Sequence, residues 1–293
     1  MNTRISLDGR YYDLDVFRRV FRPVEAPRLA VVSHVPNRTA SELLQLTIRS
    51  FRHFTPEAHE LWIVDNNSPT ENVNWLTELP DVNVILNRTE PLPPEAGTPE
   101  VITDSSENQM NWGSYANAIG LELATRLIDP RSRYFMSLHM DALPCRRGWL
   151  GFLNSKLSGK VAAAGVRMDK TRTSDGVLHV LGYMVDFQLF RRLGLDFFPR
   201  LPELDVGDRV TTALREAGYE VFACRNTMWD PHLVKLIPEG SPFQDLHVDR
   251  SFDDDGNVVF LHLGRGLRKS SGEHRKGTNV EDWVKTVSEL LLS

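Results

Sequence analysis

The segment with the clearest capacity for chemistry is an apolar run of strand length, residues 134–138, that ends in His139, Met140 and Asp141 and is soon followed by Pro144. A buried strand that presents a carboxylate at its C-terminal end has the geometry of a ligand site in an open α/β sheet. A carboxylate there also suits a hard divalent cation that carries phosphates. Asp and Pro are equally ordinary turn residues, so the segment taken alone is also consistent with a simple strand end.

Polar clusters follow two other apolar runs, at residues 33–38 and 65–70. Because the C-terminal ends of parallel strands lie at one edge of a sheet, we expect these clusters to converge with His139 and Asp141. Asp65 is placed to accept hydrogen bonds from a ribose or a base edge. A turn followed by a helix N-cap is the alternative for residues 65–70, since this composition suits turns.

The elements that would position these side chains alternate between strand and helix. Short β-branched runs followed by helical patterns predict a mostly parallel mixed sheet flanked by helices. A helix is expected over residues 39–54, with Thr39 or Ser41 as its N-cap, and another over residues 112–128. Further strands are expected at residues 29–33, 61–64, 82–86, 161–166, 219–224 and 258–261, and a closing amphipathic helix at residues 280–292.

Composition limits the class of protein. The chain has 293 residues, of which 41% are hydrophobic and 25% charged, which excludes disordered and fibrous proteins. No apolar run reaches the roughly 18 residues of a membrane span, and the N-terminus lacks the apolar core of a secretory signal. We therefore expect a soluble, cytoplasmic protein without a transmembrane segment. A net charge of −5 argues against nonspecific binding of nucleic acid. Nothing here indicates the oligomeric state.

Four segments, taken in order, resemble the GT-A-fold glycosyltransferases of the family 2 type, which use nucleotide-diphosphate sugars. They are residues 62–68, 111–120, 134–149 and 205–219, and the resemblance spans roughly residues 28–265. It implies a single-domain, Rossmann-type GT-A-like fold. We expect an N-terminal extension (1–27), a nucleotide-sugar-binding half (28–150), an acceptor-binding half (151–265), and a basic lid loop with a C-terminal helix (266–293).

The resemblance also implies a set of site residues. The metal ligands are expected to be Asp141 and His262, which would hold Mn²⁺ or Mg²⁺. The first carboxylate of the family's DxD motif is replaced by His139, which either takes over a ribose contact or is structural. An imidazole ligand would favour Mn²⁺ somewhat over Mg²⁺. The expected nucleotide-sugar-binding residues are Pro36, Asn37, Asp65, Asn67, Asn111, Gly113, Asn117, His139, Met140, Arg265 and Lys269.

Two segments would supply the remaining parts of a transferase. Residues 264–277 combine glycines with cations, as a lid over a diphosphate requires, although a solvated basic loop is the plain alternative. Asp208 is the first candidate for a general base that takes the proton of the acceptor hydroxyl, with Asp205 second and Glu203 third. Both aspartates also suit a helix N-terminus, and a retaining enzyme would need no such base.

The leading hypothesis is a metal-dependent glycosyltransferase that moves a sugar from a nucleotide-diphosphate donor to a hydroxyl of a glycan or small molecule. A nucleotidyltransferase is one alternative, although residues 33–38 lack the glycines usual after the first strand of that class. A non-catalytic sugar-nucleotide-binding or glycan-binding protein is the other, suggested by the missing first carboxylate. The donor sugar, the acceptor and the stereochemistry stay open.

Overall fold

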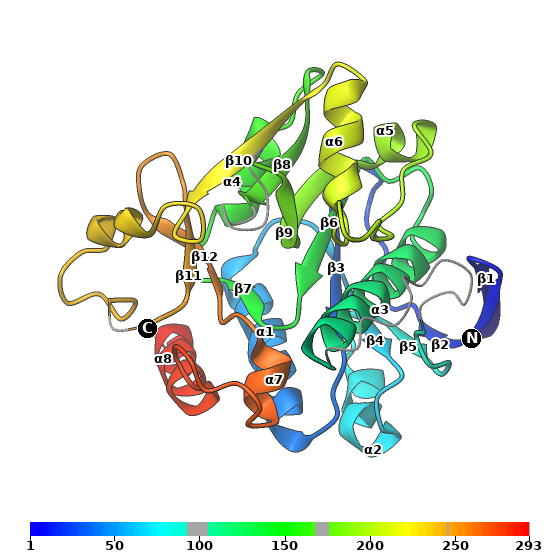
Figure 1. Cartoon of the computed structure of the whole chain (residues 1–293), viewed down its shortest axis with the longest axis horizontal. Coiled ribbons are helices and arrows are strands. Elements are labelled where there is room, and N and C mark those ends of the chain that lie inside the picture. Colours follow the sequence, from blue (N-terminus) through cyan, green and yellow to red (C-terminus); the bar gives the residue numbers. More distant parts are fainter. Residues whose placement is uncertain (93–104, 168–175, 245, 293) are drawn as a thin grey trace.

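The computed structural model describes residues 1–92, 105–167, 176–244 and 246–292, and in them a large mixed sheet runs through the molecule (Figure 1). Its strands are β1 (Asn2–Leu7), β2 (Arg10–Phe17), β3 (Arg28–Ser33), β4 (Glu60–Asn66), β5 (Asn83–Asn87), β6 (Tyr134–His139), β7 (Ala142–Pro144), β8 (Val161–Arg167), β9 (Leu178–Asp186), β10 (Glu220–Asn226), β11 (Asp249–Phe252) and β12 (Val258–His262). Their spatial order is β1-β2-β5-β4-β3-β6-β9-β8-β10-β11-β12-β7.

The centre of the sheet is parallel. Strands β5, β4, β3 and β6 pair in parallel, and β10 pairs in parallel with β8. Strand β9 runs antiparallel to both β6 and β8, so β8 points the same way as β6. Two further antiparallel pairings give β12 the direction of β10. The predicted fold class, a single α/β domain with a mixed sheet flanked by helices, is confirmed.

Helices cover both faces of this sheet. They are α1 (Arg38–Phe54), α2 (Thr70–Val73), α3 (Ser105–Leu127), α4 (Trp149–Lys156), α5 (Phe187–Arg192), α6 (Asp208–Glu216), α7 (Gly266–Ser270) and α8 (Val280–Leu292), with 3₁₀ turns η1 (Asn74–Glu78) and η2 (Pro231–Leu236). In β3, Leu29 and Val31 pack with α1, α4 and α8, whereas Ala30 and Val32 pack with α3, α5 and α6. Because successive strand residues point to opposite faces, a strand covered on both sides is apolar along its middle, as residues 29–32 of β3 are.

The N-terminal residues extend the sheet. Strands β1 and β2 form a hairpin, and β2 pairs antiparallel with β5. Within the described ranges, no helix combines the length and the apolar character that crossing a membrane requires.

Two helix starts differ from the sequence-based expectation. The N-cap of α1 is Asn37, whose Oδ1 accepts a hydrogen bond from the Ala40 amide at 2.9 Å, and not Thr39 or Ser41. An Asn side chain in that position satisfies a donor that the first helical turn leaves unpaired. Helix α3 begins at Ser105, about two turns before the expected residue 112.

Candidate functional site

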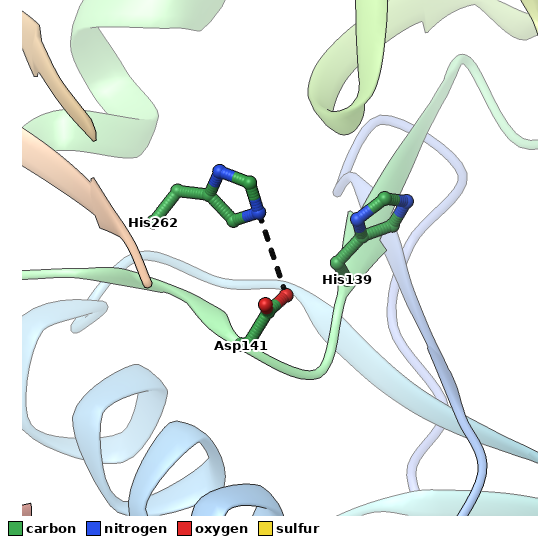
Figure 2. A group of neighbouring side chains, drawn as sticks. All are labelled: His139, Asp141 and His262. Atoms are coloured by element: carbon green, nitrogen blue, oxygen red, sulfur yellow. Dashed lines mark ion pairs between the residues drawn. The ribbon is translucent and has the colours of Figure 1, made fainter. Parts of the chain in front are cut away.

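His139, Asp141 and His262 come together where β6 and β12 end (Figure 2). Each offers one potential ligand atom, and these atoms all lie within 4.8 Å of one another. His262 Nε2 is 3.6 Å from Asp141 Oδ1. The expected convergence of Asp141 with His262 is present, and His139 joins them through its position at the end of β6. Two imidazoles and one carboxylate form a donor set that can hold a divalent cation.

The Asp141 carboxylate is held by the segment that follows β12. Its Oδ2 accepts a hydrogen bond from the Gly266 amide at 2.8 Å, and its backbone carbonyl accepts one from the Leu263 amide at 3.0 Å. A Cβ atom on residue 266 would lie only 2.6 Å from Asp141 Cβ, so this approach requires glycine. The arrangement leaves Oδ1 facing His262.

His262 is oriented by a second carboxylate. Asp249, opposite it in the β11–β12 pairing, has Oδ2 3.1 Å from His262 Nδ1. When Nδ1–H donates to this carboxylate, the lone pair of Nε2 faces Asp141. A carboxylate that fixes the outer nitrogen of an imidazole in this way is the usual support of a metal-ligating histidine.

His139 has a comparable support from α3. Its Nε2 lies 2.7 Å from Asn117 Nδ2, while its other ring nitrogen is on the side of Asp141 and His262 (Figure 2). Asn117 Oδ1 is buried without a hydrogen-bond partner. In the opposite orientation of the amide, which fills the same volume, Oδ1 accepts from Nε2–H and the Nδ1 lone pair faces Asp141.

Burial and charge set the protonation of the three side chains. Burial, aided by the charge of His262 and opposed by the charges of Asp141 and Asp205, lowers the pKa of His139 to about 4, so His139 is neutral at pH 7. Burial raises the pKa of Asp141, but the charges of the two histidines and the Gly266 amide outweigh it and the pKa is lowered. Burial also opposes a charge on His262, yet Asp141 and Asp249 together raise its pKa. The carboxylate is therefore ionised, and His262 holds its proton more firmly than His139 does.

A third histidine lies next to the site. The His179 ring centroid is 5.5 Å from that of His139 and 6.4 Å from that of His262. Its Nδ1 accepts a hydrogen bond from the Leu181 amide at 3.1 Å, which leaves Nε2 as the protonated nitrogen of the neutral ring. The sequence alone predicts that His179 is an ordinary loop histidine. The antiparallel direction of β9 places its first residues at the same edge of the sheet as the end of β6.

The two candidate bases have different surroundings. Asp208, the first residue of α6, is only 2% exposed, and its Oδ2 accepts a hydrogen bond from the Asp205 amide at 2.9 Å. Asp205 is half-buried, and its negative charge raises the pKa of His139, which places it within electrostatic range of the site. The Asp205 carboxylate also accepts a hydrogen bond, from the Val206 amide to Oδ1 at 2.7 Å, and Glu203 is exposed.

Asp65 lies at the expected edge of the sheet, but its carboxylate is occupied. The residue is fully buried, and its oxygens accept hydrogen bonds from the Ser68 amide at 3.1 Å and the Ser68 hydroxyl at 2.5 Å. Burial raises the pKa of this carboxyl group. In this conformation Asp65 shapes the turn after β4.

The other expected nucleotide-sugar contacts belong to several different elements. Asn117 touches His139 directly. Pro36 and Gly113 are exposed, Asn67 has a left-handed backbone (φ 56°), Met140 is buried, and the side chain of Asn111 lies outside the described residues.

The basic segment after β12 folds back over the site. Lys269 donates a hydrogen bond from Nζ to the Leu263 carbonyl at 3.1 Å. Burial lowers the pKa of Lys269, while the charges of Asp141 and Asp249 act in the opposite direction, so its ammonium is within electrostatic range of both carboxylates. Arg265 is exposed and has φ 56° directly before α7. One cation is therefore placed at the site and another at its rim.

No protein-family model and no curated protein matches the sequence. Among solved structures, the chain is similar to the mannosyltransferase PcManGT from Pyrobaculum calidifontis in complex with GDP-Man and Mn²⁺ (15% identity over 93% of this chain and 71% of that chain, TM-score 0.47). It is also similar to the galactosyltransferase LgtC in complex with donor and acceptor sugar analogues (10% identity over 90% of this chain and 95% of that chain, TM-score 0.49). A third similar structure is a Drosophila β-1,4-galactosyltransferase 7 mutant with manganese, UDP-Gal and xylobiose (12% identity over 89% of this chain and 79% of that chain, TM-score 0.40).

Proposed function

We propose that the protein is a metal-dependent glycosyltransferase that moves a sugar from a nucleotide-diphosphate donor to a hydroxyl acceptor. The observation that carries the proposal is the group His139, Asp141 and His262 at the C-terminal edge of an α/β sheet. Ligands of open α/β sheets bind at this edge. A basic segment is folded against the same group, through the Gly266 amide and Lys269.

The residues fit a divalent cation. The candidate ligands are one carboxylate oxygen of Asp141 and one nitrogen each of His139 and His262, and both imidazoles have an orienting partner. Oxygen-only sites suit Mg²⁺, whereas imidazole ligands shift preference towards transition metals, so we favour Mn²⁺ over Mg²⁺. A bound cation would supply Lewis-acid stabilisation of the negative charge on a departing diphosphate.

The chain's own residues have separate tasks in this proposal. Lys269, and Arg265 at the rim, bind the phosphates and exclude water from the donor. Asp205 takes the proton of the acceptor hydroxyl if the reaction inverts the anomeric centre. Asp208 holds the start of α6 and the Asp205 backbone in place.

The test combines donor binding with product analysis. UDP-, GDP- and dTDP-sugars are screened for thermal stabilisation with and without MnCl₂, because a bound ligand raises the apparent stability. The best donor is then incubated with a panel of glycans, and the released nucleotide is identified. Release of the nucleoside diphosphate supports the proposal. Pyrophosphate release would identify a nucleotidyltransferase instead, and binding without turnover a binding protein.

Asp141→Asn tests the site itself. The substitution keeps the side-chain size but removes the charge, so we expect Mn²⁺-dependent donor binding and transfer to fall at least about 100-fold, as for loss of a charged group in a site. Asp81→Asn, which alters an exposed carboxylate paired with Arg52, is the matched control and should behave as the native protein. Native transfer by the Asp141 variant would refute the proposal.

A further inference from the structure

A second group of side chains lies along the same edge of the sheet, next to His179. Arg167 is the last residue of β8, and its guanidinium lies over the indole of Trp229, with Cζ 4.5 Å from the ring centroid. In the β8–β9 pairing, Arg167 is opposite Leu178, the residue before His179. His179 in turn contacts His139. The pair of Arg167 and Trp229 is therefore one strand away from the candidate metal site.

One buried side chain holds both members of this pair. Asn226, the last residue of β10, is 1% exposed. Its Nδ2 donates a hydrogen bond to the Arg167 carbonyl at 3.2 Å, and its Oδ1 accepts one from the Trp229 amide at 2.8 Å. A single fixed amide thus sets the relative position of the two backbones. Support of this kind is what keeps a binding group in a defined geometry.

The charge of Arg167 is not compensated within the described residues. The side chain is half-buried, its Nε is buried without a hydrogen-bond partner, and no carboxylate of the described residues forms an ion pair with it. Partly buried charges are normally paired, because removal from water is costly. A guanidinium offers a planar fork of donors that matches a carboxylate or a phosphate. The indole of Trp229 lies against this guanidinium as a cation–π partner and supports its position.

We propose that Arg167, supported by Trp229 and Asn226, lies in the acceptor subsite and selects a sugar that carries an anionic group, either a carboxylate or a phosphate. The assignment of this site to the acceptor rests on the proposed glycosyltransferase function. Recognition of an anionic sugar rests only on the geometry of this pair. Arg167 binds the anion of the sugar, and Trp229 holds the guanidinium in place. A neutral sugar leaves the guanidinium unpaired and binds more weakly.

Ligand-observed NMR titrations of the full chain in metal-free buffer test the subsite without any donor. The probes are methyl β-D-glucuronide, glucose 6-phosphate and methyl β-D-glucoside. We expect at least one anionic sugar to bind about tenfold more tightly than the neutral glycoside, as for gain of a charge-assisted hydrogen bond, and the tighter probe identifies the anion as carboxylate or phosphate. Equal binding of all three probes, or binding of none, would overturn the inference.

Variants assign the preference to the arginine. Arg167→Met should bind the three probes with similar affinity, and Arg167→Lys should retain part of the preference, since lysine keeps the charge but not the planar fork. Arg225→Met removes an exposed arginine on the neighbouring strand β10 and should keep the native preference. An unchanged preference in both Arg167 variants would contradict the assignment.

Failure of this inference differs from failure of the proposed function. If no donor is turned over but the anion preference persists and depends on Arg167, the transferase proposal fails and the anionic-sugar site remains. If transfer occurs with equal kcat/KM to neutral and anionic acceptors, the transferase proposal holds and the subsite is refuted.

Discussion

Asp249 shows how a residue acts on the candidate site without being one of its three potential ligands. Its carboxylate lies 3.1 Å from His262 Nδ1 and also raises the pKa of His262. Asp141 and His262 could be named from the sequence because each stands at or just after a strand end. Asp249 could not, because its role depends on the register of the β11–β12 hairpin, in which it faces His262. Asn117, named as a nucleotide contact, supports His139 for a similar reason of packing between elements.

Asp249→Ala should lower the affinity for Mn²⁺ by about 10- to 100-fold, the usual effect of losing an outer partner of a ligating histidine. The imidazole would lose the acceptor that fixes its tautomer and its orientation. Isothermal titration calorimetry measures the change. Asp254→Ala, which removes an exposed carboxylate of the turn between β11 and β12, serves as the control. Native Mn²⁺ affinity in the Asp249 variant would show that the contact does not support the metal.

At the scale of elements, the short helix α7 matters because it begins against Asp141. The strands of the parallel centre are predictable from the sequence, since a strand covered on both faces is a continuous apolar run. The antiparallel direction of β9 is not predictable in this way, because an apolar run has the same pattern whether its strand is parallel or antiparallel to its neighbours. For that reason His179 could not be placed beside His139 from the sequence alone. The contact between α7 and Asp141 is equally unpredictable from the sequence, since its partners are 125 residues apart.

Gly266→Ala should disrupt this contact. The added Cβ would meet the Cβ of Asp141 at 2.6 Å, and neither atom is on a flexible chain, so the backbone has to move. We expect a loss of about 1–3 kcal/mol in the free energy of unfolding, typical of overpacking, together with weaker Mn²⁺ binding. Urea denaturation with and without Mn²⁺ measures both effects.

Gly159→Ala is the control for this substitution, because a Cβ at that exposed position meets no atom within 4 Å. Its effect on stability should stay within about 0.5 kcal/mol. Equal stability and equal Mn²⁺ response in the two alanine variants would mean that the close approach of α7 to Asp141 is not needed.

For the whole molecule, the sheet gathers residues that are far apart in the sequence at one edge. His139, Arg167, Asn226 and His262 are the last residues of four strands that point in the same direction. The sequence predicts such an edge from the alternation of strands and helices. It does not predict which strands are neighbours beyond β6, and so the pairing of Arg167 with Trp229 emerges only from the structure.

Because the candidate ligands are titratable and buried together, metal binding should be coupled to proton release. Asp141 and Asp249 raise the pKa of His262, so its imidazole retains a proton at a higher pH than an ordinary histidine, and a cation has to displace that proton. Below this raised pKa, protons compete with the metal, and the affinity for Mn²⁺ falls as the pH falls. His139 adds nothing to this competition near neutral pH, since its pKa is about 4.

Calorimetric titrations with Mn²⁺ between about pH 6 and about pH 8 should therefore show an affinity that increases with pH, the direction expected when a ligand must lose its proton. Titrations at one pH in buffers with different ionisation enthalpies should show a net release of protons. In His262→Gln, the proton release should disappear, and the weakened binding that remains should vary less with pH over this range. Because Asp141 is already ionised there, it provides no alternative source of the protons. An affinity for Mn²⁺ that is independent of pH in the native protein would exclude His262 as a ligand that exchanges its proton for the metal.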